Sequence, residues 1–353
     1  MFAPLNVPDL YCCSQLPPGE SLLANAYLLV TDSGNLLVDP LSFDEPTIEQ
    51  VERLGRVAAI AVLSASRAEY AEPIATRFGA TVVTQPDHGA TIMPGARAVR
   101  LPDQERPGAY AISIRDANAV VAGDALIGAP GGALSLPSRA RRADATRAAL
   151  GLRRILREDP QVLLLSFGQS LFAGAYEALY SLLYATAGAE VHRINVDELD
   201  YRPRRDERAE QPPEFTCTDA EVGYAIGARR LGYRVSKIAP GQRFCPLHAH
   251  ASSEELFFVL EGTPSVRTLA GTIRCRAGDF IAFPVGESGT HQVINESDAP
   301  ATVILLGREE DAEACYYPDS DKLLVGTRHI FAKGGDGLIV RASPELDYFD
   351  GES

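Results

Sequence analysis

Three of the chain's six histidines and one glutamate are spaced like metal ligands in the C-terminal third of the sequence. His248 and His250 alternate along an extended segment, so their side chains project to the same side. Glu255 begins an apolar run, and His291 follows a glycine-rich turn. A lone histidine on a strand is usually an ordinary surface or core residue. Three imidazoles and a carboxylate together, however, suit Fe(II), Mn(II), Zn(II) or Ni(II). We therefore predict one divalent metal ion per chain.

Short strands must position these four residues. Brief apolar runs separated by Gly, Pro, Asn and Asp follow one another through residues 221–310, a spacing typical of a β-sandwich or β-barrel. The predicted strands are Tyr233–Ile238, Leu256–Leu260, Ser265–Thr268, Thr272–Arg276, Asp279–Phe283, His291–Ile294 and Ala301–Leu306.

This region resembles the cupin family through both of its motifs. The first motif, glycine, HxH, glutamate and glycine, is matched by Gly241, His248, His250, Glu255 and Gly262. The second motif is matched by Gly278, Pro284, Gly286, His291 and Asn295. The six-residue gap before Gly262 selects Glu255 over Glu254, which is expected to point outward. This sequence has one extra residue before His248, and its loop from Gly286 to His291 is two residues longer than usual; both departures lie in turns.

The cupin resemblance implies an antiparallel jelly-roll β-barrel that is often dimeric, so we expect a homodimer. It also implies an open face of the metal where a small-molecule ligand or O2 binds. It does not imply a reaction, because one fold serves many functions. Two hypotheses follow: a metal-dependent enzyme (oxygenase, isomerase or lyase) acting on a small polar substrate, or a non-catalytic sensor or binding protein. No catalytic residue and no organic cofactor site is assigned.

Other residues are candidates for the surroundings of the metal. Strand alternation places Phe257, Val259, Val293 and Asn295 on the same faces as the ligands. Arg243, Tyr233 and Arg267 are possible substrate anchors, but solvated strand positions are the favoured interpretation of each. Cys245 and Cys275 are less favoured as extra ligands, because four are already supplied.

Residues 1–197 alternate strand-like and helix-like stretches, which indicates an α/β layered domain. The runs Asn25–Val30, Leu36–Asp39 and Val121–Leu126 make it resemble a metallo-β-lactamase-type αββα domain. Such hydrolases carry a THxHxDH metal motif, but the matching stretch Ser64–Tyr70 has no histidine, and Phe167 stands at a later ligand position. Asp124 matches the bridging carboxylate. Because metal-bound hydroxide chemistry needs several imidazole ligands, we predict a degenerate domain that neither binds zinc at that site nor hydrolyses.

The expected fold class is therefore a two-domain α+β protein. A charged, proline-broken segment, 198–220, is predicted to be a linker. After the cupin domain (221–310), an aromatic and acidic tail (311–353) is expected to pack on the barrel or on a partner subunit.

Bulk properties limit the partners. The formal net charge of −14 argues against nucleic acid and against anionic membranes. The six cysteines include no CxxC pair and are expected to be reduced. Since we find neither a secretory signal nor an apolar run near the roughly 20 residues that span a bilayer, a cytoplasmic location is expected.

Overall fold

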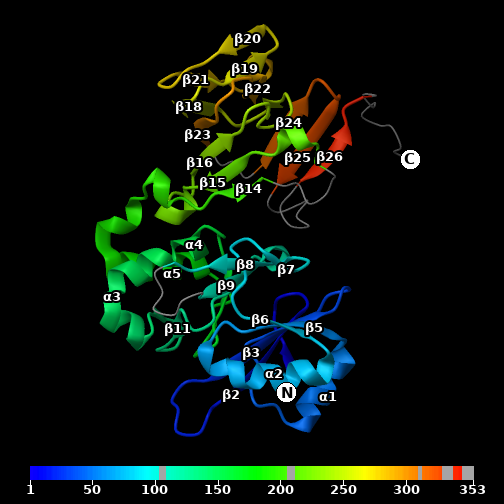
Figure 1. Cartoon of the computed structure of the whole chain (residues 1–353), viewed down its shortest axis with the longest axis vertical. Coiled ribbons are helices and arrows are strands. Elements are labelled where there is room, and N and C mark those ends of the chain that lie inside the picture. The colour runs from blue at the N-terminus through cyan, green and yellow to red at the C-terminus, as the bar shows by residue number, and fades with distance from the viewer. Residues whose placement is uncertain (103–108, 205–210, 309–311, 328–336, 344–353) are drawn as a thin grey trace, which may run out of the picture. The chain divides into compact units, whose positions relative to one another are not determined.

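The computed structural model describes the chain except for residues 103–108, 205–210, 309–311, 328–336 and 344–353, and except for the side chains of 139–143. The chain divides into two compact units. The N-terminal unit comprises Met1–Arg193 with Ala225–Gly227, and the C-terminal unit comprises Ile194–Tyr224 with Ala228–Ser353. Figure 1 shows the first in blue to green and the second mainly in yellow to red. Among the described residues, no helix is both long enough and apolar enough to cross a membrane.

The N-terminal unit contains two larger sheets and one small sheet. The first sheet has the order β1-β2-β3-β4-β5-β6, formed by β1 (Ala3–Pro4), β2 (Leu10–Gln15), β3 (Ala24–Leu29), β4 (Asn35–Val38), β5 (Val57–Ala61) and β6 (Thr81–Val83). The second has the order β13-β10-β9-β8-β7, formed by β7 (Thr91–Met93), β8 (Ala96–Arg100), β9 (Tyr110–Ile114), β10 (Ala119–Val121) and β13 (Val162–Leu164). The small sheet pairs β11 (Ile127–Gly128) with β12 (Leu134–Ser135). β3 and β4 form one antiparallel pair, and β9 and β10 form another.

Alternation along the strands gives the first sheet two apolar faces. Tyr27 and Leu36 lie in a core cluster that also includes Ile112 of the second sheet. Leu28 and Leu37, one residue further along, lie in a different cluster that contains residues of the helices α1 and α2. A strand sequence that is apolar at every position is what burial on both faces requires.

Five helices are described, and their ends follow local chemistry: α1 (Glu45–Leu54), α2 (Ala68–Phe78), α3 (Ser138–Gly151), α4 (Arg153–Leu156) and α5 (Ala175–Ala187). The Asp44 carboxylate caps α1 by accepting from the Thr47 amide at 3.1 Å, and the left-handed Gly79 ends α2. Single 3₁₀ turns complete the list: η1 (Ala65–Arg67), η2 (Arg115–Ala117), η3 (Gly188–His192), η4 (Val196–Glu198), η5 (Pro213–Phe215), η6 (Tyr224–Ile226) and η7 (Glu287–Gly289).

The C-terminal unit is built from three antiparallel sheets. The first has the order β14-β15-β16-β23-β18-β21, formed by β14 (Arg202–Pro203), β15 (Thr218–Glu221), β16 (Leu231–Ile238), β18 (Glu255–Glu261), β21 (Phe280–Phe283) and β23 (Ala301–Arg308). The second, β20-β19-β22, comprises β19 (Ser265–Thr268), β20 (Gly271–Arg274) and β22 (His291–Ile294). The third, β17-β24-β25-β26, comprises β17 (Ala249–His250), β24 (Ala312–Tyr317), β25 (Lys322–Thr327) and β26 (Leu338–Arg341). One apolar cluster joins Phe257 and Val303 of the first sheet to Val266 and Val293 of the second.

One segment differs from the sequence-based expectation. The segment 198–220, predicted to be a linker, contributes β14 and the start of β15, which pairs with β16 over Thr218–Glu221. The neighbouring sheet supplies hydrogen bonds to β14 and β15 that these two charged strands cannot make alone. The tail from residue 311 adds β24 to β17, so that Ala249 pairs with Tyr316 and His250 with Cys315.

Candidate metal centre

Backbone hydrogen bonds bring the two histidine-bearing segments together. The amide of His248 donates to the carbonyl of His291 at 3.1 Å, and the amide of His291 donates to the carbonyl of His248 at 2.9 Å. The Gly286 amide also donates to the His250 carbonyl at 2.8 Å. Glu255 opens β18, where it pairs with Phe283 and with Gly307. Sheet pairing therefore places all four candidate ligands in one region.

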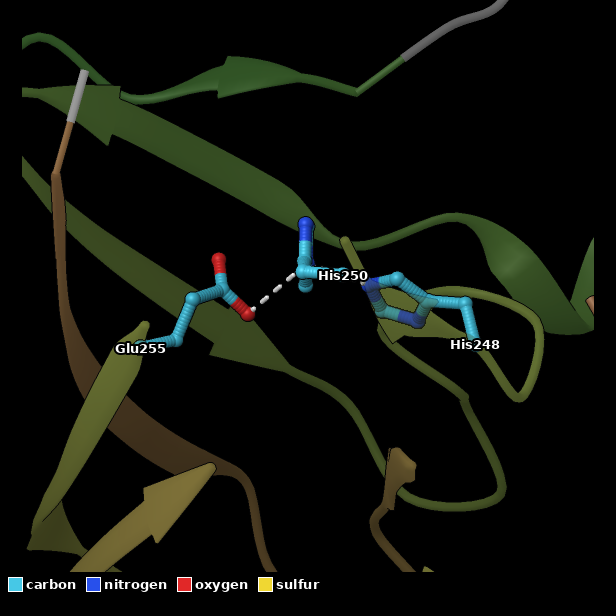
Figure 2. Close-up of side chains that lie close together, drawn as sticks. All are labelled: His248, His250 and Glu255. Carbon is cyan, nitrogen blue, oxygen red and sulfur yellow. Dashed lines mark hydrogen bonds and ion pairs between the residues drawn. The ribbon is translucent and has the colours of Figure 1, made fainter. Parts of the chain in front are cut away.

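The functional atoms of these side chains converge. The Nε2 atoms of His248 and His250 are 3.0 Å apart. One carboxylate oxygen of Glu255 lies 3.3 Å from Nε2 of His250 and 3.2 Å from Nε2 of His291. Figure 2 shows the Glu255 carboxylate directed at His250, with His248 beside it. His248, His250 and Glu255 form one potential ligand group, whose ligand atoms lie within 4.8 Å of one another. His291 adjoins this group through Glu255.

The remote ring nitrogens are held by the chain itself. Nδ1 of His248 lies 3.0 Å from the carbonyl oxygen of Pro246, and Nδ1 of His291 lies 2.8 Å from that of Gly289. A carbonyl can only accept, so both Nδ1 atoms must be the donors, and both Nε2 atoms keep a lone pair in the neutral ring. Such partners fix the tautomer and the orientation of metal-binding histidines.

Nε2 of His291 is a buried polar atom without a hydrogen-bond partner among the described residues. The residue is 0% exposed, and its ring stacks on Phe283 with centroids 3.7 Å apart. Phe257 meets the same ring edge-on at 5.5 Å. The aromatic contacts prevent the ring from turning toward water. Such a nitrogen loses the free energy of hydration unless another group, such as a cation, takes its lone pair.

Charge in the cluster is divided unevenly. Burial lowers the pKa of His248 and of His291, so both rings are neutral near pH 7. Burial also acts to lower the pKa of His250, but the neighbouring Cys315 and Glu255 outweigh it and raise that pKa to about 9. Burial acts to raise the pKa of Glu255, and the neighbouring His250 and His291 more than reverse this and lower it. In the absence of a cation, the site therefore holds a charged His250–Glu255 pair.

The residues expected to surround the ligands are buried as predicted. Phe257 and Val293 are each 1% exposed, and Val259 and Asn295 are each 0% exposed. Asn295 has a structural role, because its side-chain amide donates to the carbonyls of Ile238 and Ala299. Glu254, the competing carboxylate, is exposed.

The three possible substrate anchors lie outside the cavity beside the candidate ligands. Arg267 makes a two-pronged ion pair with Asp319, with N–O distances of 2.6 and 2.9 Å. The cavity beside the cluster, about 350 Å³ in volume, has neither Arg267, Arg243 nor Tyr233 in its wall. Its arginines are Arg204, Arg234 and Arg308. No sequence pattern pointed to Arg204, because it lies in the charged segment interpreted as a linker.

Two further residues that the sequence reasoning missed lie in the tail. Sγ of Cys315 is 3.4 Å from Nδ1 of His250, and a carboxylate oxygen of Glu313 is 3.7 Å from the same atom. Glu313 and Cys315 alternate along the apolar run of β24, and this alternation was the only sequence pattern that could have indicated them. Sγ of Cys245 contacts Nδ1 of His248 at 3.6 Å, on the opposite side of that ring from the convergence point.

In the N-terminal unit, the region of the missing histidines is filled by a different arrangement. Asp39, 0% exposed, accepts hydrogen bonds from the Leu63 and Ser64 amides at 2.7 and 2.9 Å and from two serine hydroxyls, those of Ser64 and Ser166, at 2.5 Å. Arg67, 5% exposed, lies over the ring of Phe167 at 4.8 Å. Two of its guanidinium nitrogens, Nε and Nη2, are buried without a hydrogen-bond partner among the described residues.

Comparison with known proteins agrees with both parts of this architecture. The model of the metallo-beta-lactamase superfamily matches residues 2–186, and the cupin domain model matches residues 234–307. The first match spans more than half of the chain. The chain therefore belongs to the metallo-beta-lactamase superfamily, and it carries a C-terminal cupin domain.

Individual relatives are distant or partial. A germin-like protein (subfamily 2 member 1) of Arabidopsis thaliana is 38% identical over 94 residues, which are 25% of this chain and 42% of that protein. The chain thus spans less than half the length of this curated relative. A sugar phosphate isomerase of the cupin superfamily from Silicibacter pomeroyi is 23% identical, with a TM-score of 0.37, over 45% of this chain and 98% of that one. A metallo beta lactamase from Erythrobacter litoralis is 14% identical, with a TM-score of 0.41, over 52% of this chain and 89% of that one.

Proposed function

We propose that His248, His250, Glu255 and His291 hold one divalent metal ion. The observation that carries this proposal is the convergence of three Nε2 atoms on a carboxylate, with the His291 nitrogen buried and lacking a hydrogen-bond partner. The donor set fits: the neutral rings of His248 and His291 are each held in one tautomer, His250 becomes a ligand on losing one proton, and the carboxylate is ionised. Fe(II), Mn(II), Zn(II) and Ni(II) all accept these ligands, so the donor atoms alone do not select one metal.

We further propose that the C-terminal unit is a metal-dependent enzyme that acts on a small polar molecule. A bound divalent ion would supply Lewis acidity, or a binding position for O2, to a ligand in the adjoining cavity. Backbone carbonyls hold the imidazoles in place, and Phe257 and Phe283 exclude water from the face of His291. The cavity beside His248, His250 and Glu255 is the route by which a substrate would reach the ion.

The test is metal analysis of the purified full-length chain together with the variant His291→Ala. We expect the wild type to carry or take up one equivalent of metal and the variant to lose stoichiometric binding, because one ligand and its fixed lone pair are gone. His192→Ala is the matched control, since His192 is exposed and lies in the N-terminal unit. Full metal occupancy in His291→Ala would refute the ligand assignment. Metal binding with no turnover of any candidate substrate would favour the sensor hypothesis over an enzyme.

For the N-terminal unit we propose a catalytically inactive, metal-free hydrolase domain. Its support is chemical: the stretch Ser64–Tyr70 offers no imidazole, and Arg67 brings a permanent positive charge near Asp39 and Asp124. A guanidinium next to these carboxylates offsets their negative charge, which a metal ion would otherwise do, and it repels an incoming cation. Such a domain could still pack against another chain or bind a ligand.

We also propose the finer architecture expected from the sequence. In the N-terminal unit, a core shared by both sheets and a second core shared with α1 and α2 favour an αββα arrangement. In the C-terminal unit, the core shared by the six-stranded and three-stranded sheets favours a jelly-roll barrel. Cupin domains are often dimeric, and a homodimer is the assembly we propose.

A further inference from the structure

The cavity beside the candidate metal centre is rich in arginine. Its wall includes His248, His250 and Glu255 together with three arginines, Arg204, Arg234 and Arg308. Space for a ligand comes from the sheet itself: Gly232 of β16 pairs with Gly307 of β23, and Gly307 pairs in turn with Glu255. Neither glycine has a side chain, which leaves space over the sheet directly next to the candidate ligand Glu255.

Arg204 is held in position while one of its guanidinium nitrogens is left without a hydrogen bond. Its guanidinium lies over the ring of Phe244, 4.4 Å from the ring centre. Its backbone amide donates to the Cys217 carbonyl at 2.9 Å. Nη1 is buried and has no hydrogen-bond partner among the described residues; its ion-pair partner is Asp219, 3.7 Å away. A buried guanidinium nitrogen without an acceptor is costly unless a ligand satisfies it.

Asp219 places a second guanidinium beside the first. Its carboxylate lies 4.0 Å from Nη1 of Arg234, and it accepts a closer hydrogen bond, 2.6 Å long, from the Ser236 hydroxyl. The contacts with both arginines are therefore long ones, unlike the two-pronged pair of Arg267 with Asp319. Planar guanidinium groups in such a setting can still bind a carboxylate or phosphate through two parallel hydrogen bonds.

Charge also favours an anion once a metal is present. The three arginines in the wall face three glutamates, Glu221, Glu255 and Glu313. A divalent cation added to this balance leaves the cavity with excess positive charge, even when Asp219 is counted. In a partly enclosed site, uncompensated charge has an unfavourable free energy, and an anionic ligand would neutralise that charge.

The geometry points to a small oxyanion-bearing ligand, with a carboxylate or phosphate group bound by Arg204 and Arg234 and a second oxygen reaching the metal. This inference rests on the proposed metal centre and narrows its substrate class. The volume of about 350 Å³ is near the lower end for small-molecule sites, so the ligand is a small metabolite-sized anion.

The test uses the full-length, metal-loaded chain, with malonate and inorganic phosphate as probes in isothermal titration calorimetry. Metal content is measured first, in the wild type and in Arg204→Gln and Arg234→Gln. We expect all three to hold one equivalent of metal, because neither arginine is a ligand. We expect at least one probe to bind the wild type and to bind each variant about tenfold or more weakly. The stronger probe identifies the anion class, carboxylate or phosphate.

Arg267→Gln is the matched control, because it removes an arginine charge that is already paired with Asp319 and lies outside the cavity wall. It should leave the affinity for the probe unchanged. Arg204→Lys separates geometry from charge, and it should restore only part of the lost affinity. Unchanged binding in both Arg204→Gln and Arg234→Gln, or binding of neither probe by the metal-loaded wild type, overturns the inference and leaves the metal proposal standing. A wild type that takes up no metal overturns the proposed function itself.

Discussion

At the scale of single residues, the candidate centre is defined by which protons its imidazoles carry. His248 and His291 have lowered pKa values because they are buried, and each donates its Nδ1 proton to a backbone carbonyl. His250 is the exception, since Cys315 and Glu255 raise its pKa to about 9. Only His250 must lose a proton before it can bind a cation at neutral pH.

We therefore predict that metal binding releases about one proton per ion near pH 7. A metal ion competes with the His250 proton below its pKa of about 9, so apparent affinity should rise by roughly tenfold per pH unit from pH 7 and level off above pH 9. Calorimetry in buffers of different ionisation enthalpy measures the number of protons released. Release of no proton, or of three, would contradict the assigned protonation states.

A second prediction concerns Gly289, whose carbonyl accepts from Nδ1 of His291. An added Cβ would lie 1.7 Å from the carbonyl oxygen of Pro284, so Gly289→Ala must displace the turn that orients His291. We expect a loss of about 1–3 kcal/mol in the free energy of unfolding and weaker metal binding, measured by denaturant unfolding and metal titration. The exposed neighbour Ser288 supplies the control, Ser288→Ala, which should change neither. Wild-type stability in Gly289→Ala would show that the turn is more pliable than this contact implies.

At the scale of elements, the strand β24 supports the segment that carries His250. The Glu313 carboxylate accepts from the amides of Ala251 and Ser252, both at 3.1 Å, just beyond β17. Neighbouring hydrogen bonds and His250 lower its pKa, although burial alone would raise it. The tail thus fixes the chain direction immediately after a candidate ligand.

We predict that Glu313→Ala lowers metal affinity without removing the site. Two backbone amides lose a charged acceptor, and each such hydrogen bond contributes about 1.5–3 kcal/mol at most. A five- to fifty-fold weakening is expected in a competitive metal titration. Glu296→Ala, at an exposed position, tests whether loss of a surface carboxylate alone has any effect. Equal metal affinities in Glu313→Ala and wild type would show that the tail does not support the site.

Comparison of sequence and structure at this scale shows which strands and helices the local sequence pattern is sufficient to predict. The alternating apolar runs predicted β16, β18, β19 and β21–β23 to within a few residues, because apolar residues predominate on their inward faces. The helix α2 begins at Ala68 and carries Pro73 inside it, so a proline is not a reliable sequence signal for the start of a helix. β15, with the sequence TDAE, was missed because its carboxylates face arginines distant in sequence.

The four candidate ligands were found from motif spacing. Arg204, Glu313 and Cys315 were not, because only tertiary pairing brings them to the site.

At the scale of the whole molecule, the two units have separate cores, so they should respond separately to metal. We predict that saturating metal raises one unfolding transition in calorimetry and leaves another unchanged, since a ligand at 100 times its Kd stabilises its own unit by about 2.7 kcal/mol. Arg67→Ala marks the N-terminal unit by removing a buried guanidinium that contacts Phe167, and it should lower only the metal-insensitive transition. A metal-induced rise in the transition that Arg67→Ala lowers would contradict a metal-free N-terminal unit.

The paired amides and carbonyls of His248 and His291 have a consequence for assembly. Because the backbones of these two residues are hydrogen-bonded to each other, the chain between them must already be folded before an ion could contact both rings. The ion would then stabilise a structure that has already folded, and it would not guide folding. Loading should accordingly slow the opening of the C-terminal unit far more than it hastens its formation.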